Sequence, residues 1–521
     1  MERQDEKIAY LIALPAIILA IALKIVPLLD AFKLPFIDYK PALGLGGSPY
    51  IGFRNFSSLF STYYFRRLVS NTLMLKFGFV FISGVVALIL GLSLSYIKRG
   101  WLRTIFIILS TIPYFIPASV YSYILLGTIS TQYFLDPERF RISYIMLEVL
   151  RSSGILSIIV FSFIETRRRY GNTNLVSAVR AITILLLIQL SSLMTTDFEM
   201  LNEFLNPLVY NVADTIDTYM FRAGLLNGKV NQVSPMWLIR FIIQLFITIG
   251  VYYTIKNTYS EERAEEQEFE ESSKRTLSEE KSYPRILSIV IYCIYIVVLC
   301  LPLISILISK GELIASTGSD KFKNVEILPI FIKYISITLV SVILNLFITI
   351  LLAYPLTISH SRGKIAYEVL LLILLVSGQG GVHEFLYYRD IGMLSTVYPY
   401  ILDGFFSIMN VLVLAGLYNS EYSFSKFSDY FTKLRRPAVA LAGLRFIAMW
   451  NSYYLFQMPY VQNADMYSPI TLFKTMVANA AGELNRPLML MGLLVSLPPL
   501  IIGILLCIFA DKRTFISYIR D

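Results

Sequence analysis

The sequence alternates between long apolar runs and short polar connections. A helix needs about 20 apolar residues to cross the hydrocarbon core of a bilayer. Twelve runs meet or approach that length, at residues 8–29, 73–97, 105–129, 142–164, 175–194, 237–255, 286–308, 334–358, 366–382, 397–417, 438–456 and 488–509. The pattern predicts an all-α polytopic membrane protein with about 12 transmembrane helices.

A single charged stretch, residues 257–284, interrupts this pattern near the centre of the chain. It is rich in Glu and has too few apolar residues to bury a core. We therefore predict two transmembrane halves, 1–256 and 285–521, joined by a charged cytoplasmic linker. The linker is either a solvated tether or a segment that lies against basic loops on the same face.

The two halves also repeat weakly, which favours two parallel six-helix units. Arg168-Arg169 and Arg435-Arg436 occupy corresponding places, and each half has one span broken by Pro or Gly, at 111–117 (TIPYFIP) and 377–381 (SGQGG). Interrupted helices at corresponding positions are typical of transporters whose path runs between the repeats. Ordinary tolerated kinks are the alternative for either break.

Composition and charge agree with a membrane protein. Hydrophobic residues make up 56% of the chain and charged residues 16%, well below the quarter usual in soluble domains. Alternate crossing puts most short loops with Lys or Arg on one face, which we predict to be cytoplasmic together with both termini. The net charge of +9 is therefore no indication of nucleic acid. Residues 30–69, with Arg54, Arg66 and Arg67, are predicted to lie outside, against this trend.

Nothing in the sequence indicates catalysis or a bound cofactor. The three cysteines lie in apolar runs, and the two histidines are not at metal-ligand spacing. There is no phosphate-binding glycine loop with a following Lys-Ser or Lys-Thr. We predict no enzyme, no metal site and no cofactor on this chain.

Several segments resemble the permease subunits of carbohydrate-uptake ABC importers. They are PFIDYKP (35–41), SPYIGFRNF (48–56) and NPLVYNVADTIDTYMFRAGL (206–225) in the first half, and AYPL (353–356), SGQGG and MWNSYY (449–454) in the second. The order resembles a fused pair from the maltose-type, binding-protein-dependent superfamily, in the branch serving oligosaccharides from polysaccharides. The resemblance implies a type I importer fold in the cell membrane, a sugar substrate, two ATPase subunits, an extracellular sugar-binding protein and membrane lipid as partners.

The loops that would contact the ATPases depart from that family's Glu-Ala-Ala…Gly pattern. The first, 165–174, keeps Glu165 and Gly171 and adds Arg168; the second, 418–437, has Lys426 and Arg435 but neither Gly nor Ala. Three alternatives follow: an ATPase contact rebuilt with basic residues, one loop that still functions, or a permease-derived protein without ATPase coupling. The last would be a scaffold, a partner subunit or an ATPase-independent transporter.

Sugar sites combine aromatic faces with convergent polar groups. The candidates for the substrate path are Trp450, Asn451, Tyr453, Tyr114, Phe115, Gln379 and Asn410. Since Tyr and Phe are abundant in this chain, core packing or an interfacial belt explains any one of them equally well.

Charges within the expected spans are costly and default to functional hypotheses. We expect Asp403 and Arg445 to pair between neighbouring spans, and Glu148 to pair with Arg151 one turn away. Arg180 and Arg240 are expected to extend their head groups toward the membrane surface.

One outer segment combines acidic and aromatic residues. Residues 214–222 (DTIDTYMFR) are predicted to lie outside the membrane. The resemblance implies that Asp214, Asp217, Tyr219 and Arg222 contact the binding protein. A surface or re-entrant helix without a partner is the alternative.

Overall fold

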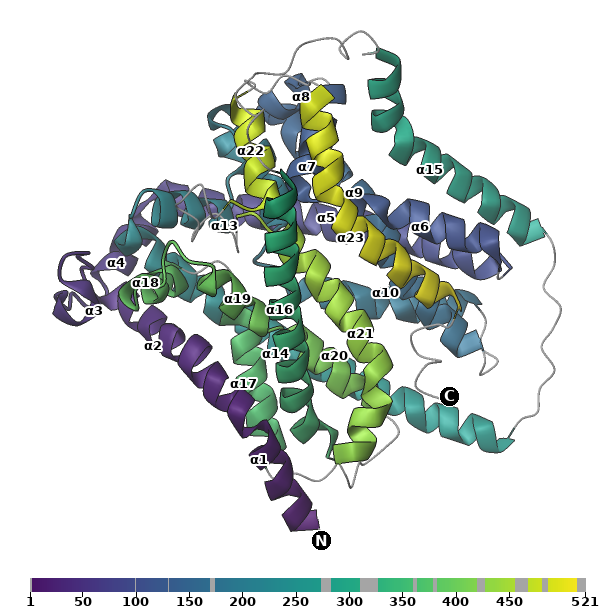
Figure 1. The fold of residues 1–521 in the computed structure, drawn as a ribbon, viewed down its shortest axis with the longest axis horizontal. Helices are drawn as coiled ribbons and strands as arrows, with labels where there is room; N and C mark the ends of the chain where they lie inside the picture. Colours follow the sequence, from purple (N-terminus) through teal and green to yellow (C-terminus); the bar gives the residue numbers. More distant parts are fainter. Residues whose placement is uncertain are drawn as a thin grey trace. The chain divides into compact units, whose positions relative to one another are not determined.

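The structure is a computed structural model, and it describes residues 2–98, 100–129, 131–168, 174–272, 283–309, 327–358, 363–377, 382–418, 427–454, 467–479 and 486–512. The described residues are almost entirely helical, and their β-structure is one isolated antiparallel bridge between Ile37 and Tyr50 (Figure 1). This confirms the predicted all-α polytopic class.

Among the described residues, seven stretches are long and apolar enough to cross a membrane by themselves. Each coincides with an expected span: Lys7–Phe36, Tyr63–Tyr96, Pro137–Glu165, Val230–Asn257, Ile327–Thr357, Tyr398–Gly416 and Leu488–Ile508. They are built by α1 (Glu2–Ala20), η1 (Ile21–Ile25), α2 (Val26–Lys33), η2 (Leu34–Phe36), α5 (Tyr63–Tyr96), α9 (Pro137–Arg168), α14 (Val230–Ser272), α16 (Ile327–Ala353), η7 (Tyr354–Thr357), α19 (Tyr398–Phe405), α20 (Ile408–Tyr418) and α23 (Arg486–Lys512).

Two further expected spans are bent helix pairs. One is α6 (Trp101–Phe115) with α7 (Ala118–Thr128), which meet at 94°. The other is α17 (Lys364–Ser377) with α18 (Val382–Asp390), which meet at 90° across 378–381, outside the described residues. Both bends fall at the sequence-predicted breaks, and the Pro-rich interruption at 111–117 is confirmed as a sharp turn.

The expected total of 12 spans is not confirmed. Counting each bent pair as one span raises the number among the described residues to nine. The other three expected spans are represented by α10 (Asn174–Leu190), α15 (Tyr283–Ser309) and α21 (Phe427–Asn451). The apolar parts of α10 and α15 are short, at Ser177–Leu190 and Arg285–Leu301.

Shorter helices fill the connections, and the sequence pattern did not predict them individually. They are α3 (Gly44–Gly47), α4 (Arg54–Ser61), α8 (Gln132–Leu135), α11 (Phe198–Phe204), η3 (Pro207–Val209), α12 (Tyr210–Ala213), α13 (Ile216–Tyr219), η4 (Met220–Leu226) and α22 (Pro469–Asn479). The charged stretch is also helical in part, because α14 continues through it as far as Ser272.

The chain divides by its internal contacts into two compact units, each drawn from both halves of the sequence. The first comprises Met1–Thr72, Asp214–Leu245 and Thr317–Gly482; the second comprises Leu73–Ala213, Phe246–Ser316 and Glu483–Asp521. The predicted halves, 1–256 and 285–521, describe a repeat along the sequence, whereas these units describe which residues pack together. The two halves therefore stay a prediction.

In the first unit, α16 packs against α19, α20 and α21, and α1 packs against α16 (Figure 1). Ala9, Ala13, Ala16 and Ala20 form a stripe on α1 that is at most 4% exposed. Small residues at this spacing let helix backbones approach closely, which matters in lipid because apolar surface alone does not drive helices together. The stripe therefore holds the first span against the second-half helices.

In the second unit, α9 packs against α6 and α10, and α23 packs against α6. Gly154 on α9 lies directly under α6, where an added Cβ would overlap the backbone carbonyl of Ser110. A backbone atom cannot move aside as a flexible side chain can. The glycine is therefore required for the close approach of the two helices.

Replacing Gly154 with alanine is expected to destabilise the protein by about 1–3 kcal/mol, because overpacking forces the backbones apart. Gly250→Ala is the matched control, since nothing lies within 4 Å of its added Cβ. Alanine at that helical position is expected to be neutral or slightly stabilising. Thermal unfolding of both purified variants in detergent measures the difference, and equal melting temperatures would contradict the packing argument.

Candidate functional site

In the second unit, an arginine side chain binds the backbone at the helix break, 111–117. Pro117 has no N–H to continue α6, and Ile116 takes an extended conformation between α6 and α7, so its carbonyl has no helical partner. The carbonyl of Ile116 accepts a hydrogen bond from Nη2 of Arg151 at 3.2 Å. A bent helix at membrane depth needs such internal satisfaction of its backbone.

The same guanidinium is paired with an acidic residue far along the chain. Nη1 of Arg151 lies 2.9 Å from Oδ2 of Asp197, and the two side chains are 10% and 29% exposed. The rings of Tyr114 and Tyr121 each lie 6.0 Å from the guanidinium carbon. The expected ion pair of Arg151 with Glu148 is therefore wrong: the partner is Asp197, which also caps the start of α11 through the amide of Met200.

The two path candidates at this break differ in accessibility. Tyr114 is 38% exposed, whereas Phe115 is 1% exposed. The ring of Phe115 packs so closely on Gly503 of α23 that an added Cβ would overlap it. Tyr114 therefore keeps a partly accessible side chain, and Phe115 contributes to helix packing.

The first unit contains a buried charge cluster that joins three helical elements. Nζ of Lys24, in the π-helical turn η1, lies 2.8 Å from Oε1 of Glu384 on α18 and 3.1 Å from Oδ1 of Asp403 on α19. The hydroxyl of Tyr388 donates to the same Asp403 oxygen at 2.8 Å. The three charged side chains are between 5% and 14% exposed.

Sequence reasoning missed Lys24 and Glu384. A lone lysine inside an apolar run was the signal that could have found Lys24, because such a charge in a span is expensive. The π-helical turn is a further mark of a specialised position. It leaves the carbonyl of Ala22 available to the hydroxyl of Tyr387, which donates to it at 3.0 Å.

Arg445 stabilises a second interrupted helix in the same unit. Its guanidinium donates to the carbonyls of Asp403, Gly404 and Phe406 at 2.9–3.2 Å, where α19 ends before α20 begins. The expected ion pair between Asp403 and Arg445 is therefore wrong in detail. Arg445 binds the backbone at this position, and the Asp403 carboxylate binds Lys24 and Tyr388.

The aromatic motif at the end of α21 divides into buried and accessible residues. Trp450 is 1% exposed and stacks on Phe446 with ring centroids 5.7 Å apart. Asn451 and Tyr453 are half-buried, as is Asn410 on α20, while Gln379 lies outside the described residues. Nζ of Lys474, on α22, lies 5.0 Å from the ring centroid of Tyr453 and donates to the hydroxyl of Tyr454 at 2.6 Å. Lys474 was not predicted.

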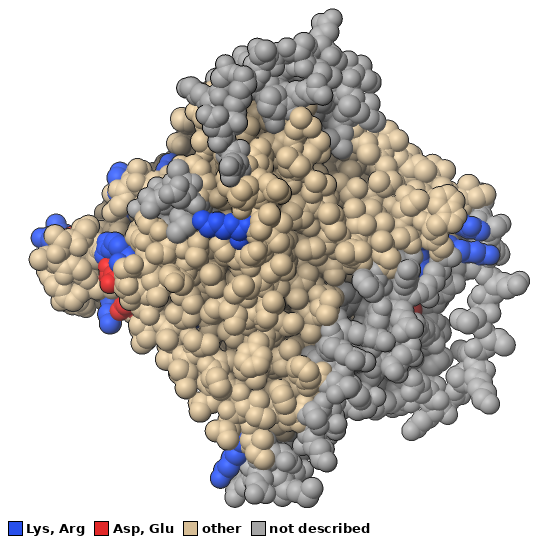
Figure 2. Space-filling view, viewed as in Figure 1, with Lys and Arg blue, Asp and Glu red and all other residues tan. Residues whose placement is uncertain are grey.

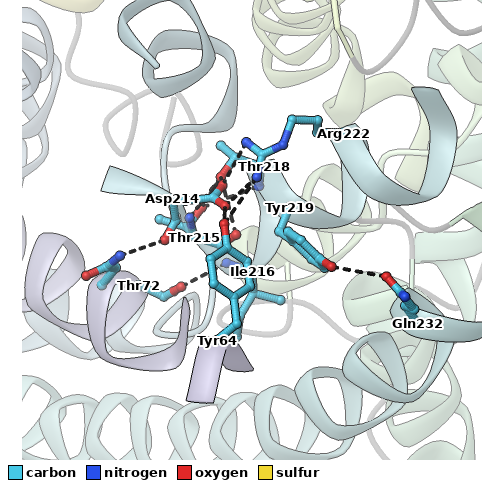
Figure 3. A network of polar contacts seen from close by, with 10 residues as sticks. Tyr64, Thr72, Asp214, Thr215, Ile216, Thr218, Tyr219, Arg222 and Gln232 are labelled. Atoms are coloured by element: carbon cyan, nitrogen blue, oxygen red, sulfur yellow. Dashed lines mark hydrogen bonds and ion pairs between the residues drawn. The ribbon is translucent and has the colours of Figure 1, made fainter. Parts of the chain in front are cut away.

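Figure 3 shows how Asp214 organises the outer segment. Its carboxylate, which is completely buried, accepts from Nη2 of Arg222 at 2.6 Å, from the hydroxyl of Thr218 at 2.7 Å and from the hydroxyl of Tyr64. Its carbonyl accepts from the side-chain amide of Asn71 at 2.9 Å. The network ties the start of α5 to α13 and η4.

The burial of Asp214 limits which of the predicted contact residues are accessible to a partner protein. Asp217 is only slightly exposed: it pairs with Nη1 of Arg240 at 2.5 Å, and the two side chains are 10% and 5% exposed. The guanidinium of Arg240 thus binds an acid of the outer segment, and the expectation that it extends toward the membrane surface stays a prediction. Tyr219 is half-buried and donates to Gln232 at 3.3 Å. Tyr219 and the partly exposed Arg222 are accessible to a partner, and the two acids are not.

The predicted coupling residues lie mostly at the edge of the described chain. Glu165 is half-buried near the end of α9, and Arg168 is the last residue of that helix. Arg435 lies within α21, whose helix begins at Phe427 and continues without interruption to Asn451. Gly171 and Lys426 lie outside the described residues. Residues 427–437 therefore extend the eleventh expected span.

Within the described part of the chain, no group of three or more His, Cys, Asp or Glu side chains could hold a metal ion. The buried acids are used instead in ion pairs and hydrogen bonds. Together with long apolar helices and two sharply bent pairs, they define a multi-pass membrane protein with polar clusters inside the helix packing.

The sequence is similar to two proteins of Bacillus subtilis (strain 168). Protein LplB is 23% identical over 287 residues, which cover 48% of this chain and 89% of LplB. The polygalacturonan/rhamnogalacturonan transport system permease protein YteP is 25% identical over 278 residues, which cover 47% of this chain and 86% of YteP. These likenesses confirm the predicted resemblance to carbohydrate-uptake permeases. No protein-family model matches the chain.

Two solved structures are also similar to about half of the chain. One is a bacterial alginate ABC transporter in complex with an alginate pentasaccharide-bound periplasmic protein, and the other is a bacterial ABC transporter involved in the import of the acidic polysaccharide alginate. Each matches with 21% identity and a TM-score of 0.42, covering 49% of this chain and 96% of the matched chain.

Proposed function

We propose that this chain is the membrane permease of an ABC-type importer for sugars or oligosaccharides. The observation that carries the proposal is the sequence likeness to YteP, a transport-system permease matched over 86% of its own length. That match occupies 47% of this chain, which leaves room for a second permease-like half. The two halves, 1–256 and 285–521, would then form the translocation path between them.

The proposal assigns the driving reaction to other chains. Two ATPase subunits would bind on the cytoplasmic face, near the loops at 165–174 and 418–437, and an extracellular sugar-binding protein would deliver the substrate. Both termini and the charged stretch would lie on the ATPase side, as the distribution of Lys and Arg predicts. ATP hydrolysis would then take place entirely outside this chain.

The bent helices support a path for a polar substrate. Sharp interruptions at membrane depth are tolerated where the backbone is buried in protein or lines a cavity. Among the path candidates, Tyr114, Asn410 and Tyr453 retain partly accessible side chains, whose ring faces and amide suit a sugar, whereas the amide oxygen of Asn451 is buried. Trp450 and Phe115 would support these residues from behind.

Copurification of the full chain from its native membrane tests the proposal directly. We expect a stoichiometric pair of ATPase subunits and a sugar-binding protein to be identified by mass spectrometry. Charge reversal at Arg168 and Arg435 is expected to lower ATPase recovery several-fold, whereas Arg139→Glu, at an exposed arginine outside the loops, is the matched control.

Two outcomes would contradict this proposal. Recovery of the chain with a different complex and without any ATPase would favour a permease-derived scaffold. Saccharide uptake that persists after the associated ATPase is removed would favour an ATPase-independent transporter.

A further inference from the structure

The segment between the first and second spans is a folded element with its own hydrogen bonds. The bridge between Ile37 and Tyr50 closes it: the amide of Asp38 donates to Pro49 and the amide of Ile51 donates to Phe36, both at 2.9 Å. The side-chain amide of Asn55, on α4, donates to the carbonyls of Pro35 and Ile37 at 3.1 and 3.0 Å. These contacts fix α3 and α4 beside the end of η2.

The element is also attached to neighbouring helices of the same unit. The side chain of Asn231, on α14, accepts from the amide of Tyr39 and donates to Asp38, both at 2.8 Å. Nη2 of Arg389, on α18, donates to the hydroxyl of Tyr39 at 2.7 Å. One candidate span ends at Phe36 and the next begins at Tyr63, so the element lies at the level of a membrane surface.

This element carries large aromatic side chains that the protein leaves uncovered. Tyr50 is 74% exposed, and Phe53 and Tyr63 are each 71% exposed; Phe60 is exposed as well. Aromatic rings are enriched where membrane helices meet the headgroup region, because one end is apolar and the other tolerates water. We call these four residues, together with Arg54 and Arg66, the α4 face.

The basic residues of the α4 face have no counter-charge within the described residues. Arg54 and Arg66 are exposed, and neither forms an ion pair there. Arg67, next to Arg66, lies over the ring of Tyr63 at 4.9 Å. Figure 2 shows basic atoms, with a smaller number of acidic ones, at the end of the view where α3 and α4 lie, next to described surface that is mostly neither acidic nor basic.

From these observations we propose that the α4 face binds the phosphate groups of anionic phospholipids. Arg54 and Arg66 supply the positive charge, and the rings of Tyr50, Phe53 and Tyr63 lie in the headgroup layer. Unpaired basic residues near a membrane surface are attracted to anionic lipid, whereas aromatic residues anchor the same segment by their apolar surface. This also accounts for basic residues in a segment that the charge distribution places outside.

The test compares lipid-dependent stability of the full chain. Protein in detergent is supplemented with phosphatidylglycerol or with phosphatidylcholine, and its melting temperature is followed. Phosphatidylglycerol is expected to raise the melting temperature more than phosphatidylcholine does. The double variant Arg54→Gln/Arg66→Gln should lose at least half of that difference, and high salt should reduce it in the parent protein.

Three controls make the result specific. Arg139→Gln removes an exposed arginine from α9 and should retain the full lipid effect. Arg54→Lys/Arg66→Lys should retain most of the effect, because the charge is kept. Tyr50→Ser/Phe53→Ser should reduce the stabilisation by both lipids. The measured quantity is the difference between the melting-temperature shifts that the two lipids cause. This difference can be compared between variants even when their melting temperatures without lipid differ.

The proposal is overturned if phosphatidylglycerol and phosphatidylcholine act equally on the parent protein, or if the Arg54/Arg66 double Gln variant keeps the full difference. In the second case, binding of a soluble extracellular partner is measured as well, and the double variant can keep the lipid effect but lose that partner. That result would assign the α4 face to protein docking.

Discussion

Replacing Lys24 with methionine is expected to lower the free energy of unfolding by about 3–5 kcal/mol, because it leaves two buried carboxylates without their shared cation. Glu384 and Asp403 both lie within 3.1 Å of the Lys24 ammonium, at 14% and 5% exposure. In a membrane-spanning segment, neither water nor lipid can replace that charge. The measurement is thermal unfolding of the purified chain in detergent.

The matched control is Lys33→Met, nine residues along the same helical stretch. Lys33 is 68% exposed and lies 3.2 Å from Asp30, so its loss should change stability by about 1 kcal/mol or less. The triple variant Lys24→Met/Glu384→Gln/Asp403→Asn removes all three charges and should recover at least half of the loss. If Lys24→Met and Lys33→Met melt at the same temperature, the buried cluster does not hold the three elements together.

Replacing Asp214 with alanine is expected to cost about 3 kcal/mol or more, because it strands several donors at once. The guanidinium of Arg222 and the hydroxyls of Tyr64 and Thr218 all point at this carboxylate. A buried donor without a partner carries the full cost of its desolvation. Thermal unfolding measures the loss, and Asp214→Asn should lie between alanine and the parent because it keeps an acceptor oxygen.

Asp136→Ala is the control for this second experiment. Asp136 is 38% exposed, pairs with Arg139, which is 59% exposed, and accepts from the amide of Glu138 at the start of α9, so its removal should cost only about 1 kcal/mol. Equal melting temperatures for Asp214→Ala and Asp136→Ala would show that the network in Figure 3 contributes no more than an exposed helix cap. Binding of an extracellular sugar-binding protein, measured on folded Asp214→Asn, would then test the segment's other predicted role, which is contact with that protein.

The positions of the spans were predictable because they depend on local composition. A run of about 20 apolar residues identifies a span regardless of what surrounds it. The two bends were predictable for a similar reason, since Pro removes a backbone donor and Gly weakens a helix wherever they occur. Neither property reports how the helices are paired.

The polar contacts were not predictable because they join distant residues. Lys24 and Glu384 are 360 residues apart, and Arg151 and Asp197 are 46 apart. A search one helical turn away selected Glu148 for Arg151, and a search of the neighbouring span selected Asp403 for Arg445. Arg151 pairs instead with the distant carboxylate of Asp197, and Arg445 donates to backbone carbonyls freed where α19 ends.

Accessibility was equally hidden from the sequence. Trp450 and Tyr453 belong to one motif, yet the first is 1% exposed and stacked while the second remains half-buried beside Lys474. The short helix α22, which brings Lys474 to these rings, has 11 residues and is too short to register as a span.

The alanine stripe of α1 has a consequence for biosynthesis. Its partner α16 begins at Ile327, so more than half of the chain must be synthesised before the first span can pack. Until then α1 has only lipid, or a membrane chaperone, against its small-residue face. Because Met1–Thr72 belongs to the same unit as Thr317–Gly482, a ribosome that stops at the charged stretch releases a chain whose first helix has lost its partner. Joining both halves in one polypeptide guarantees that this partner arrives, in equal number and in the same patch of membrane.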